Sequence, residues 1–251
     1  MLDPTASIYE IFSGIQGEGA LTGIRQVFVR FCGCNRHCRF CDTQEACQVV
    51  PKCAVERDPG SRQFANAWNP LSVQQVADAV SALDTFAGLH QSVALTGGEP
   101  LLRVDFLAAL CPVLRERELP TYLETNGTLP DALAEVLGDI DHVAMDMKLA
   151  SATGEPTDWD AHARFLDLAA ARSVQVKLVV AAETLADELE RVADLVEAVK
   201  PTIPVILQPV TATPDVQPPS PLQVLAMQGA LRHRLPDVRV IPQIHKLIDQ
   251  K

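Results

Sequence analysis

The sequence predicts an α/β fold, a partial TIM-like β/α barrel of about six βα units. Strand-like runs alternate with helix-like stretches; the runs end at Thr96, Thr125, Met147, Val180 and Gln208. Repeated βα units imply parallel strands with right-handed crossovers, and therefore a doubly wound sheet or a barrel. Six units are fewer than the eight of a full barrel, so we expect an incomplete one.

Each element of this fold has its own signal. The run 26–31 (QVFVRF) is typical of a strand and opens the βα series. Ser72 and Gln75 form a capping box before a helical pattern, and the clearest helical periodicity covers 185–199. The stretch 47–70 is polar without a clear period, so we interpret it as a loop insertion. The proline-rich segment 211–221 predicts an extended connection.

Composition limits the classes of protein to consider. The 251 residues, 47% of them hydrophobic, suit a single domain spanning 1–251. A net charge of -11 argues against a nucleic-acid partner, because phosphate contacts need clustered Lys and Arg. No apolar run approaches the ~20 residues of a membrane helix, and the N-terminus lacks the basic-then-apolar layout of a secretory signal, so we expect a cytoplasmic protein without membrane contact.

The cysteines predict a metal centre. Six of the seven lie between residues 32 and 53, and Cys34, Cys38 and Cys41 follow the pattern CxxxCxxC just after the first strand of the series. Three thiolates on one loop can hold three corners of a 4Fe–4S cluster, whereas fully protein-held clusters commonly use four. The fourth iron then stays open to bind and activate a ligand. The alternative is a closed zinc site completed by His37 or another thiol, although zinc patterns usually come as two separated pairs.

A second motif lies at the end of the next strand. The sequence Thr96-Gly97-Gly98-Glu99-Pro100 places two glycines where a backbone could approach a ligand closely. Taken alone, it would be an ordinary βα turn. With CxxxCx(aromatic)C, here carrying Phe40 at the aromatic position, the chain resembles the radical S-adenosylmethionine (SAM) superfamily. That resemblance implies a radical SAM core, in which SAM chelates the open iron and is cleaved to a 5′-deoxyadenosyl radical.

Further segments resemble one family of this superfamily, 7-carboxy-7-deazaguanine synthase. They are Ile15-Gln16-Gly17-Glu18-Gly19, Val27 to Arg30, Cys41-Asp42-Thr43, Leu207 to Val210 and Pro242 to Lys246. The resemblance implies a lyase that converts 6-carboxy-5,6,7,8-tetrahydropterin into 7-carboxy-7-deazaguanine with loss of ammonia, in queuosine and 7-deazapurine biosynthesis. It also implies a homodimer and an electron donor such as flavodoxin or ferredoxin.

The same resemblance assigns the substrate contacts. They fall on Ile15, Gln16, Gly17, Arg30 and Thr96. Arg30 suits the substrate carboxylate because a guanidinium is a bidentate, permanently charged partner; the alternative is a strand-end arginine in solvent. Gln16 and Glu18 either read a pterin edge or cap the glycine-rich turn. No catalytic acid or base is assigned.

SAM contacts follow from the resemblance at the ends of successive strands, where such sheets bind ligands. They fall on Phe40, Cys41, Asp42, Gly98, Asp146, Met147, Lys148, Gln208, Pro209, Val210 and Thr211. Asp146-Met147-Lys148 departs from the family's common serine-proline-lysine turn. Glu124, Thr125 and Asn126 either reach the SAM ribose or form a plain βα turn. Thr43 is implied as a Mg²⁺ ligand beside the substrate carboxylate.

Several features fall outside this pattern. We interpret Cys47 and Cys53 as inert rather than as ligands of a second metal, and Cys111 as core packing. Some family members close the pterin pocket with their C-terminal residues, but residues 247–251 give no match for such a closure. A glycyl-radical activase and a non-catalytic Fe–S or zinc module remain as alternative functions.

Overall fold

The computed structural model describes residues 3–250 and is built on a ten-stranded sheet in the order β12-β11-β10-β9-β8-β7-β3-β2-β4-β5. Seven neighbouring strands run parallel, and this series continues the predicted βα repeat. Their bounds are β3 Arg25–Phe31, β7 Ser92–Gly97, β8 Thr121–Thr125, β9 His142–Asp146, β10 Ser173–Val180, β11 Val205–Pro209 and β12 Val238–Val240.

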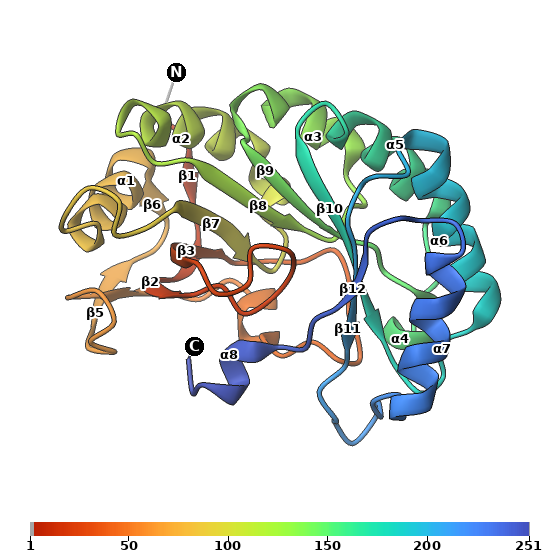
Figure 1. Cartoon of the computed structure of the whole chain (residues 1–251). Coiled ribbons are helices and arrows are strands. Elements are labelled where there is room, and N and C mark those ends of the chain that lie inside the picture. Colours follow the sequence, from red (N-terminus) through yellow and green to blue (C-terminus); the bar gives the residue numbers. More distant parts are fainter. Residues whose placement is uncertain (1–2, 251) are drawn as a thin grey trace.

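The long helices line the outside of the curved sheet, as Figure 1 shows. They are α1 Val73–Leu83, α2 Val104–Glu116, α3 Pro130–Val136, α5 Trp159–Ala169, α6 Ala186–Val199 and α7 Pro221–Arg232. The predicted Ser72–Gln75 capping box begins α1, and the expected 185–199 helix is α6. Short turns of helix complete the fold: η1 Gln44–Cys47, η2 Pro100–Arg103, η3 Leu137–Asp139, α4 Ala150–Thr153 and α8 Ile244–Leu247.

Strand alternation divides the sheet into two chemically different faces. Outward residues such as Val29, Leu95, Leu123 and Leu178 are fully buried in one apolar core with the helices. Residues at the intervening positions face inward and include many polar side chains. This arrangement fits a partial TIM-like barrel, whose inner face is left open rather than closed by further strands.

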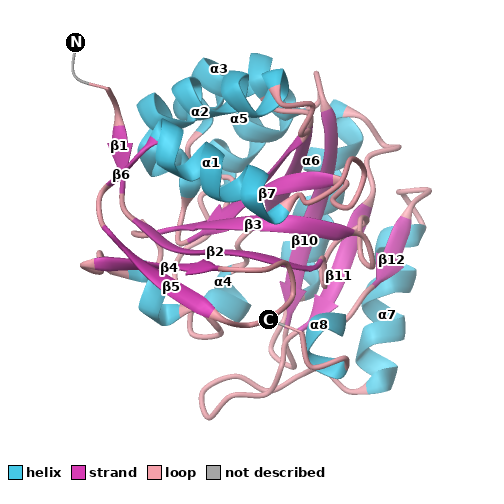
Figure 2. Ribbon diagram, turned by 90° about the vertical axis from the view of Figure 1, so that its left-hand side faces the viewer, coloured by secondary structure: helices cyan, strands magenta, loops and turns pink. Residues whose placement is uncertain are grey.

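The segment 47–70 is not the loop that its polarity predicts. Strands β4 (Lys52–Glu56) and β5 (Phe64–Trp68) pair as a hairpin, and β4 lies parallel to β2 (Ile8–Ile15), which itself runs antiparallel to β3. Figure 2 shows the hairpin at one edge of the sheet. An edge hairpin is half exposed and therefore lacks the apolar periodicity of a central strand. Two short strands, β1 (Thr5–Ala6) and β6 (Leu71–Ser72), pair separately.

The C-terminal segment crosses the open side of the barrel. In Figure 1, α8 lies on the side of the sheet opposite the outer row of helices. The backbone N–H of Ile244 donates to the carbonyl of Gly17 at 3.0 Å, so the two ends of the chain meet there. The predicted extended connection 211–221 carries the chain from β11 to α7. No helix within residues 3–250 has the length and apolar character needed to cross a bilayer.

Candidate active site

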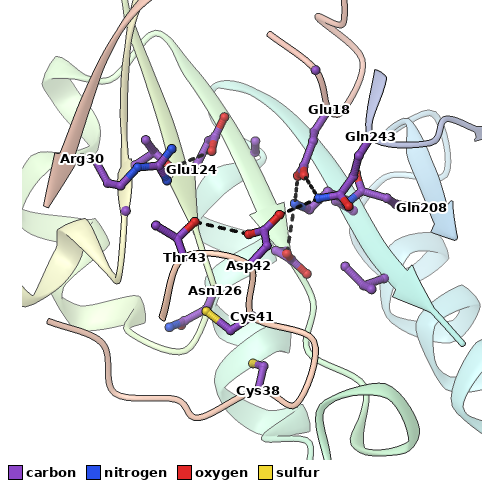
Figure 3. Close-up of a pocket in the computed structure, with 18 of the residues that line it drawn as sticks. Glu18, Arg30, Cys38, Cys41, Asp42, Thr43, Glu124, Asn126, Gln208 and Gln243 are labelled. Atoms are coloured by element: carbon purple, nitrogen blue, oxygen red, sulfur yellow. Dashed lines mark hydrogen bonds and ion pairs between the residues drawn. The ribbon is translucent and has the colours of Figure 1, made fainter. Parts of the chain in front are cut away.

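A cavity of about 580 Å³ lies on the inner face of the barrel. All of the predicted cluster cysteines, substrate residues and magnesium ligand line it, and so do Phe40, Asp42, Gly98, Asp146, Lys148, Gln208, Val210 and Thr211. Figure 3 shows how side chains from the cluster loop, the strand ends and the C-terminal segment converge there. The structure therefore brings most of the predicted site residues together around one cavity.

Two predicted SAM residues do not line this cavity. Met147 is fully buried in the main apolar core, because its side chain points to the helical side of the sheet. Pro209 ends β11 between two lining residues, Gln208 and Val210. Successive side chains of a strand point to opposite faces, so a run of consecutive residues places only every second side chain in the cavity.

The cluster loop is held from two sides. The Asn35 amide and hydroxyl of Thr128 interact at 2.9 Å, and Asn126 Nδ2 donates to Asn35 Oδ1 at 2.8 Å. On the other side, the Arg39 backbone N–H donates to the carbonyl of Thr153 at 3.0 Å. His37, the candidate fourth zinc ligand, is mostly exposed and lies 3.6 Å from Glu155.

Burial shapes the chemistry of the loop thiols. It raises the pKa of Cys34, and it raises the pKa of Cys38 to about 11, although the nearby Lys148 ammonium opposes this shift. A metal or cluster must therefore displace protons when it binds these thiols, and its positive charge provides the compensation. Cys34, Cys38 and Cys41 line one cavity, which Cys47 also borders, and three motif thiols on one loop fit a cluster with one open iron.

The Gly97–Gly98 turn packs directly on the cluster loop. A Cβ on Gly98 would lie 1.9 Å from the carbonyl oxygen of Gly33, and Gly97 has a φ of +124°. Glycine is thus required here because the protein's own backbone lies so close, and a ligand bound beside the turn would add to this requirement. Next in the motif, Glu99 accepts hydrogen bonds from the Thr125 hydroxyl and the Asn126 N–H, and burial raises its pKa to about 7.

A network of buried charges crosses the cavity floor. Asp146 Oδ2 lies 2.9 Å from Lys148 Nζ and 3.1 Å from Lys177 Nζ, and Lys177 also pairs with Glu18. Burial disfavours all these charges, yet the neighbouring Asp146 and Glu18 raise the pKa of Lys177 well above its usual value. Glu18 therefore faces the cavity as part of an ion pair and does not cap the turn.

Two buried acceptors in the cavity have no partner among residues 3–250. They are Asp146 Oδ1 and Gln208 Oε1, both at the carboxyl ends of parallel strands. A buried acceptor without a hydrogen bond costs about 1–3 kcal/mol, so such atoms mark the place of a donor that binds from outside the chain. Both were predicted SAM contacts, and a ligand with amino or hydroxyl groups fits them.

Two of the predicted substrate residues, Gln16 and Thr96, contact the carboxylate of Glu124. Glu124 accepts from the Gln16 amide at 2.6 Å and from the Thr96 hydroxyl at 2.7 Å. Arg30 is largely buried, and its Nε donates to Glu10 at 2.9 Å, so it is not a solvent-exposed strand end. Figure 3 places Arg30 and Glu124 on the same side of the cavity. The Thr43 hydroxyl also lines the cavity and donates to Asp42 at 3.3 Å.

The C-terminal segment Pro242 to Lys246, which is part of the family resemblance, supplies cavity residues to which the sequence assigned no role. Gln243 Nε2 donates to Glu18 at 2.7 Å and to Asp42 at 2.9 Å, as dashed lines in Figure 3 mark. Lys246 lies 3.2 Å from Asp42. Although burial opposes it, the charge of Lys246 and the amide of Gln243 hold the pKa of Asp42 at about 2. This segment ties the glycine-rich turn to the cluster loop.

Other lining residues were missed although a signal existed. Tyr122, Gln175 and Lys177 sit at inward positions of β8 and β10. In the sequence, Gln175 and Lys177 alternate with Val and Leu, and polar residues at every second position of a buried strand indicate a polar inner face. Gln175 Nε2 donates to the Tyr122 hydroxyl at 2.7 Å.

Comparisons with known proteins agree with this geometry. Residues 28–153 match the model of the radical SAM superfamily. The chain is 43% identical to the 7-carboxy-7-deazaguanine synthase of Geobacter sulfurreducens over 251 residues, which cover all of both chains. It is 34% identical to the synthase of Thermococcus kodakarensis, over 86% of this chain and 84% of the other.

Solved structures share the fold at low sequence identity. The crystal structure of QueE from Escherichia coli superposes with a TM-score of 0.62 at 20% identity, covering 95% of this chain and 94% of that one. A radical SAM methyltransferase from Sphaerobacter thermophilus gives a TM-score of 0.60 at 17% identity, covering 88% of this chain and 70% of the other. At these identities, the likeness concerns the fold.

Proposed function

Because the chain belongs to the 7-carboxy-7-deazaguanine synthase family of radical SAM enzymes, we propose that it converts 6-carboxy-5,6,7,8-tetrahydropterin into 7-carboxy-7-deazaguanine and ammonia. The observation that carries the proposal is the 43% identity with a named synthase along the whole chain. The inner-face cavity supports it, since that space borders the three thiols and the largely buried Arg30. Whole-length relatives of this kind disfavour a glycyl-radical activase and a non-catalytic metal module.

In this proposal, Cys34, Cys38 and Cys41 hold a 4Fe–4S cluster. The family implies this cluster together with SAM, and the pair supplies a 5′-deoxyadenosyl radical when bound. Asp146 and Gln208 satisfy donors of SAM through their unpartnered oxygens, while Lys148 keeps Asp146 oriented. Phe40, Asp42, Gly98, Val210 and Thr211 complete that half of the cavity.

The other half of the cavity binds the pterin. Arg30 pairs with the substrate carboxylate, because its guanidinium already lies inside the cavity and is held through Nε by Glu10. Gln16 and Thr96 contact the ring edge, and Glu124 fixes both of them. Ile15 and Gly17 form the wall below the C-terminal segment, where the Gly17 carbonyl accepts from Ile244.

Further parts of the proposal rest on the family resemblance. Thr43 would contribute one oxygen ligand to Mg²⁺, an ion that usually keeps waters and substrate oxygens as its other ligands. We also propose a homodimer, an electron donor such as flavodoxin or ferredoxin, and a cytoplasmic location. Thr43 lines the cavity, which supports its role near the substrate carboxylate.

Anaerobic reconstitution tests the function directly. Purified protein is loaded with iron and sulfide, then supplied with reductant, SAM, Mg²⁺ and the pterin, and product and ammonia are followed by mass spectrometry and a coupled assay. We expect both products, and neither with Cys38→Ala. Formation of 5′-deoxyadenosine without 7-carboxy-7-deazaguanine would contradict the pterin assignment and leave the radical SAM class intact.

A further inference from the structure

Cys47 lies beside the cluster loop although it is outside the CxxxCxxC motif. It ends the short helix η1 (Gln44–Cys47), which turns the chain back toward residue 41. The Ala46 backbone N–H donates to the carbonyl of Thr43 at 3.1 Å, and the Ala46 carbonyl accepts from the Gly33 N–H at 2.8 Å. Because Ala46 is fully buried, this turn is fixed against the end of β3.

The fixed turn brings two sulfur atoms together. Cys41 Sγ and Cys47 Sγ lie 4.0 Å apart, and both residues line the cavity. A disulfide needs an S–S separation of about 2.05 Å, so closing the bond takes a movement of about 2 Å. Side-chain rotation and a small shift of the loop can supply such a movement without repacking the core.

The remaining cysteines differ in their access to reagents. Cys32, Cys53 and Cys111 are fully buried and absent from the cavity lining. Cys34 and Cys38 are partly accessible, like Cys41 and Cys47. A small oxidant that enters the cavity therefore meets four thiols, three of which are the predicted cluster ligands.

We propose that Cys41 and Cys47 form a reversible disulfide when the chain carries no cluster. With the cluster bound, Cys41 is a ligand and cannot react. After cluster loss, Cys41 in the disulfide can be reduced back to the free thiol. Stepwise oxidation of a single thiol to the sulfinic or sulfonic acid is, by contrast, irreversible for most proteins. The inference depends on Cys41 being a cluster ligand and is independent of the substrate.

The chemistry balances with glutathione disulfide as oxidant. One protein thiolate attacks a glutathione sulfur and releases one glutathione, and the second protein thiol then attacks the mixed disulfide and releases the other. One S–S bond forms in the protein, and one breaks in the oxidant. The two protein thiols lose two electrons and two protons, and the two glutathione molecules gain them.

The chain offers a clean way to detect this bond. Trypsin cleaves after Arg36, Arg39 and Lys52, so Cys41 and Cys47 share the peptide 40–52, while Cys38 leaves in the peptide 37–39. The full-length protein is stripped of iron with a chelator, exposed to glutathione disulfide, alkylated and digested. We expect the peptide 40–52 to resist alkylation and to be lighter by about 2 Da, the two hydrogens lost on oxidation.

A cross-link between peptides 37–39 and 40–52, with Cys47 alkylated, would overturn the proposal, because it would show that Cys38 is the partner of Cys41. Full alkylation of both thiols in 40–52 would overturn it as well. Neither measurement requires turnover, so failure here is distinct from failure of the proposed function.

Variants test the protective role. Cys47→Ser and, as a matched control, Cys111→Ser are oxidised with hydrogen peroxide, which can carry an unpaired thiol to the sulfinic acid, and are then reduced with dithiothreitol and reconstituted anaerobically. Cluster recovery is read from iron content and visible absorbance. We expect recovery to fall several-fold for Cys47→Ser alone. Equal recovery in wild type and Cys47→Ser would overturn the protective role. Failure of unoxidised Cys47→Ser to assemble a cluster would make Cys47 a ligand and overturn the proposal.

Discussion

The two faces of the parallel sheet are built from the same strands but differ in chemistry. The outward face is apolar and packs on the helices, and the inward face carries charged and polar side chains. On β10, Leu178 faces outward into the apolar core and is fully buried, whereas its neighbour Lys177 faces inward and pairs with Asp146 and Glu18. Apolar burial contributes free energy of folding at roughly 25 cal/mol per Å². Buried charges contribute little or nothing to stability, so their presence on one face indicates binding or catalysis.

The largest expected effect concerns Arg30, the proposed anchor of the substrate carboxylate. Arg30→Gln should lower kcat/KM for the pterin at least about a hundredfold, because it removes a charge-assisted bidentate contact. Steady-state kinetics of the reconstituted enzyme measure this loss. Arg191→Gln, on the outer helix α6, is the matched control and should behave as wild type. An unchanged kcat/KM in Arg30→Gln would remove Arg30 from the site.

The pH dependence of folding stability tests the side of the sheet that the helices cover. His162 of α5 is buried; its Nδ1 lies 3.1 Å from the Gly127 carbonyl and its Nε2 3.2 Å from the Lys148 N–H. A neutral ring satisfies both contacts by donating from Nδ1 and accepting at Nε2. Burial lowers the pKa of His162 to about 4, against 6.5 for the ordinary group.

As the pH falls, His162 is therefore protonated at a higher pH in the unfolded chain than in the folded chain. Stability should be unaffected above about pH 6.5, decrease between pH 6.5 and 4, and lose up to about 3 kcal/mol from this group in all. Urea unfolding at several pH values measures the slope. His162→Gln keeps a donor and an acceptor without titrating, so its slope should be shallower in that window; an identical slope would contradict the assignment.

A smaller effect is expected at the rim of the cavity. Gln243→Ala removes the amide that joins Glu18 to Asp42, and we expect KM for the pterin to rise about tenfold, equivalent to about 1.4 kcal/mol, with little change in kcat. Kinetics at saturating SAM provide the readout. Gln74→Ala, on the exposed surface of α1, serves as control. A fall in kcat at unchanged KM would mean that Gln243 acts in catalysis instead of closure.

Local signals explain what could be predicted from the sequence. Cys34, Cys38 and Cys41 are close neighbours in the chain, so spacing alone indicated their common site. Strand ends such as Thr96 and Gln208 were predicted because parallel strands place their carboxyl ends on one edge. The alternation of polar and apolar residues in β10 likewise indicates that Lys177 faces inward.

Other features had no local signal. Gln243 meets Glu18 across 225 positions of sequence, and no periodicity encodes such a contact. The hairpin β4–β5 was interpreted as a loop because an edge strand buries too little of either face to show a clear pattern. Cys47 has unremarkable spacing, and the fold alone brings it next to Cys41.

The central claim is that the outward face of the sheet stabilises the fold, whereas the inward face serves binding and catalysis. Its most direct test compares adjacent residues of one strand. Unfolding free energy and turnover are measured in parallel for Lys177→Met and Leu178→Ala. We predict that Lys177→Met loses activity about a hundredfold, while its stability falls by only about 1 kcal/mol, because Asp146 keeps its ion pair with Lys148 and Glu18 keeps its hydrogen bond from Gln243. Leu178→Ala should lose about 3 kcal/mol of stability and keep its kcat/KM. Full activity in Lys177→Met, or a stability loss there as large as that of Leu178→Ala, would contradict the account.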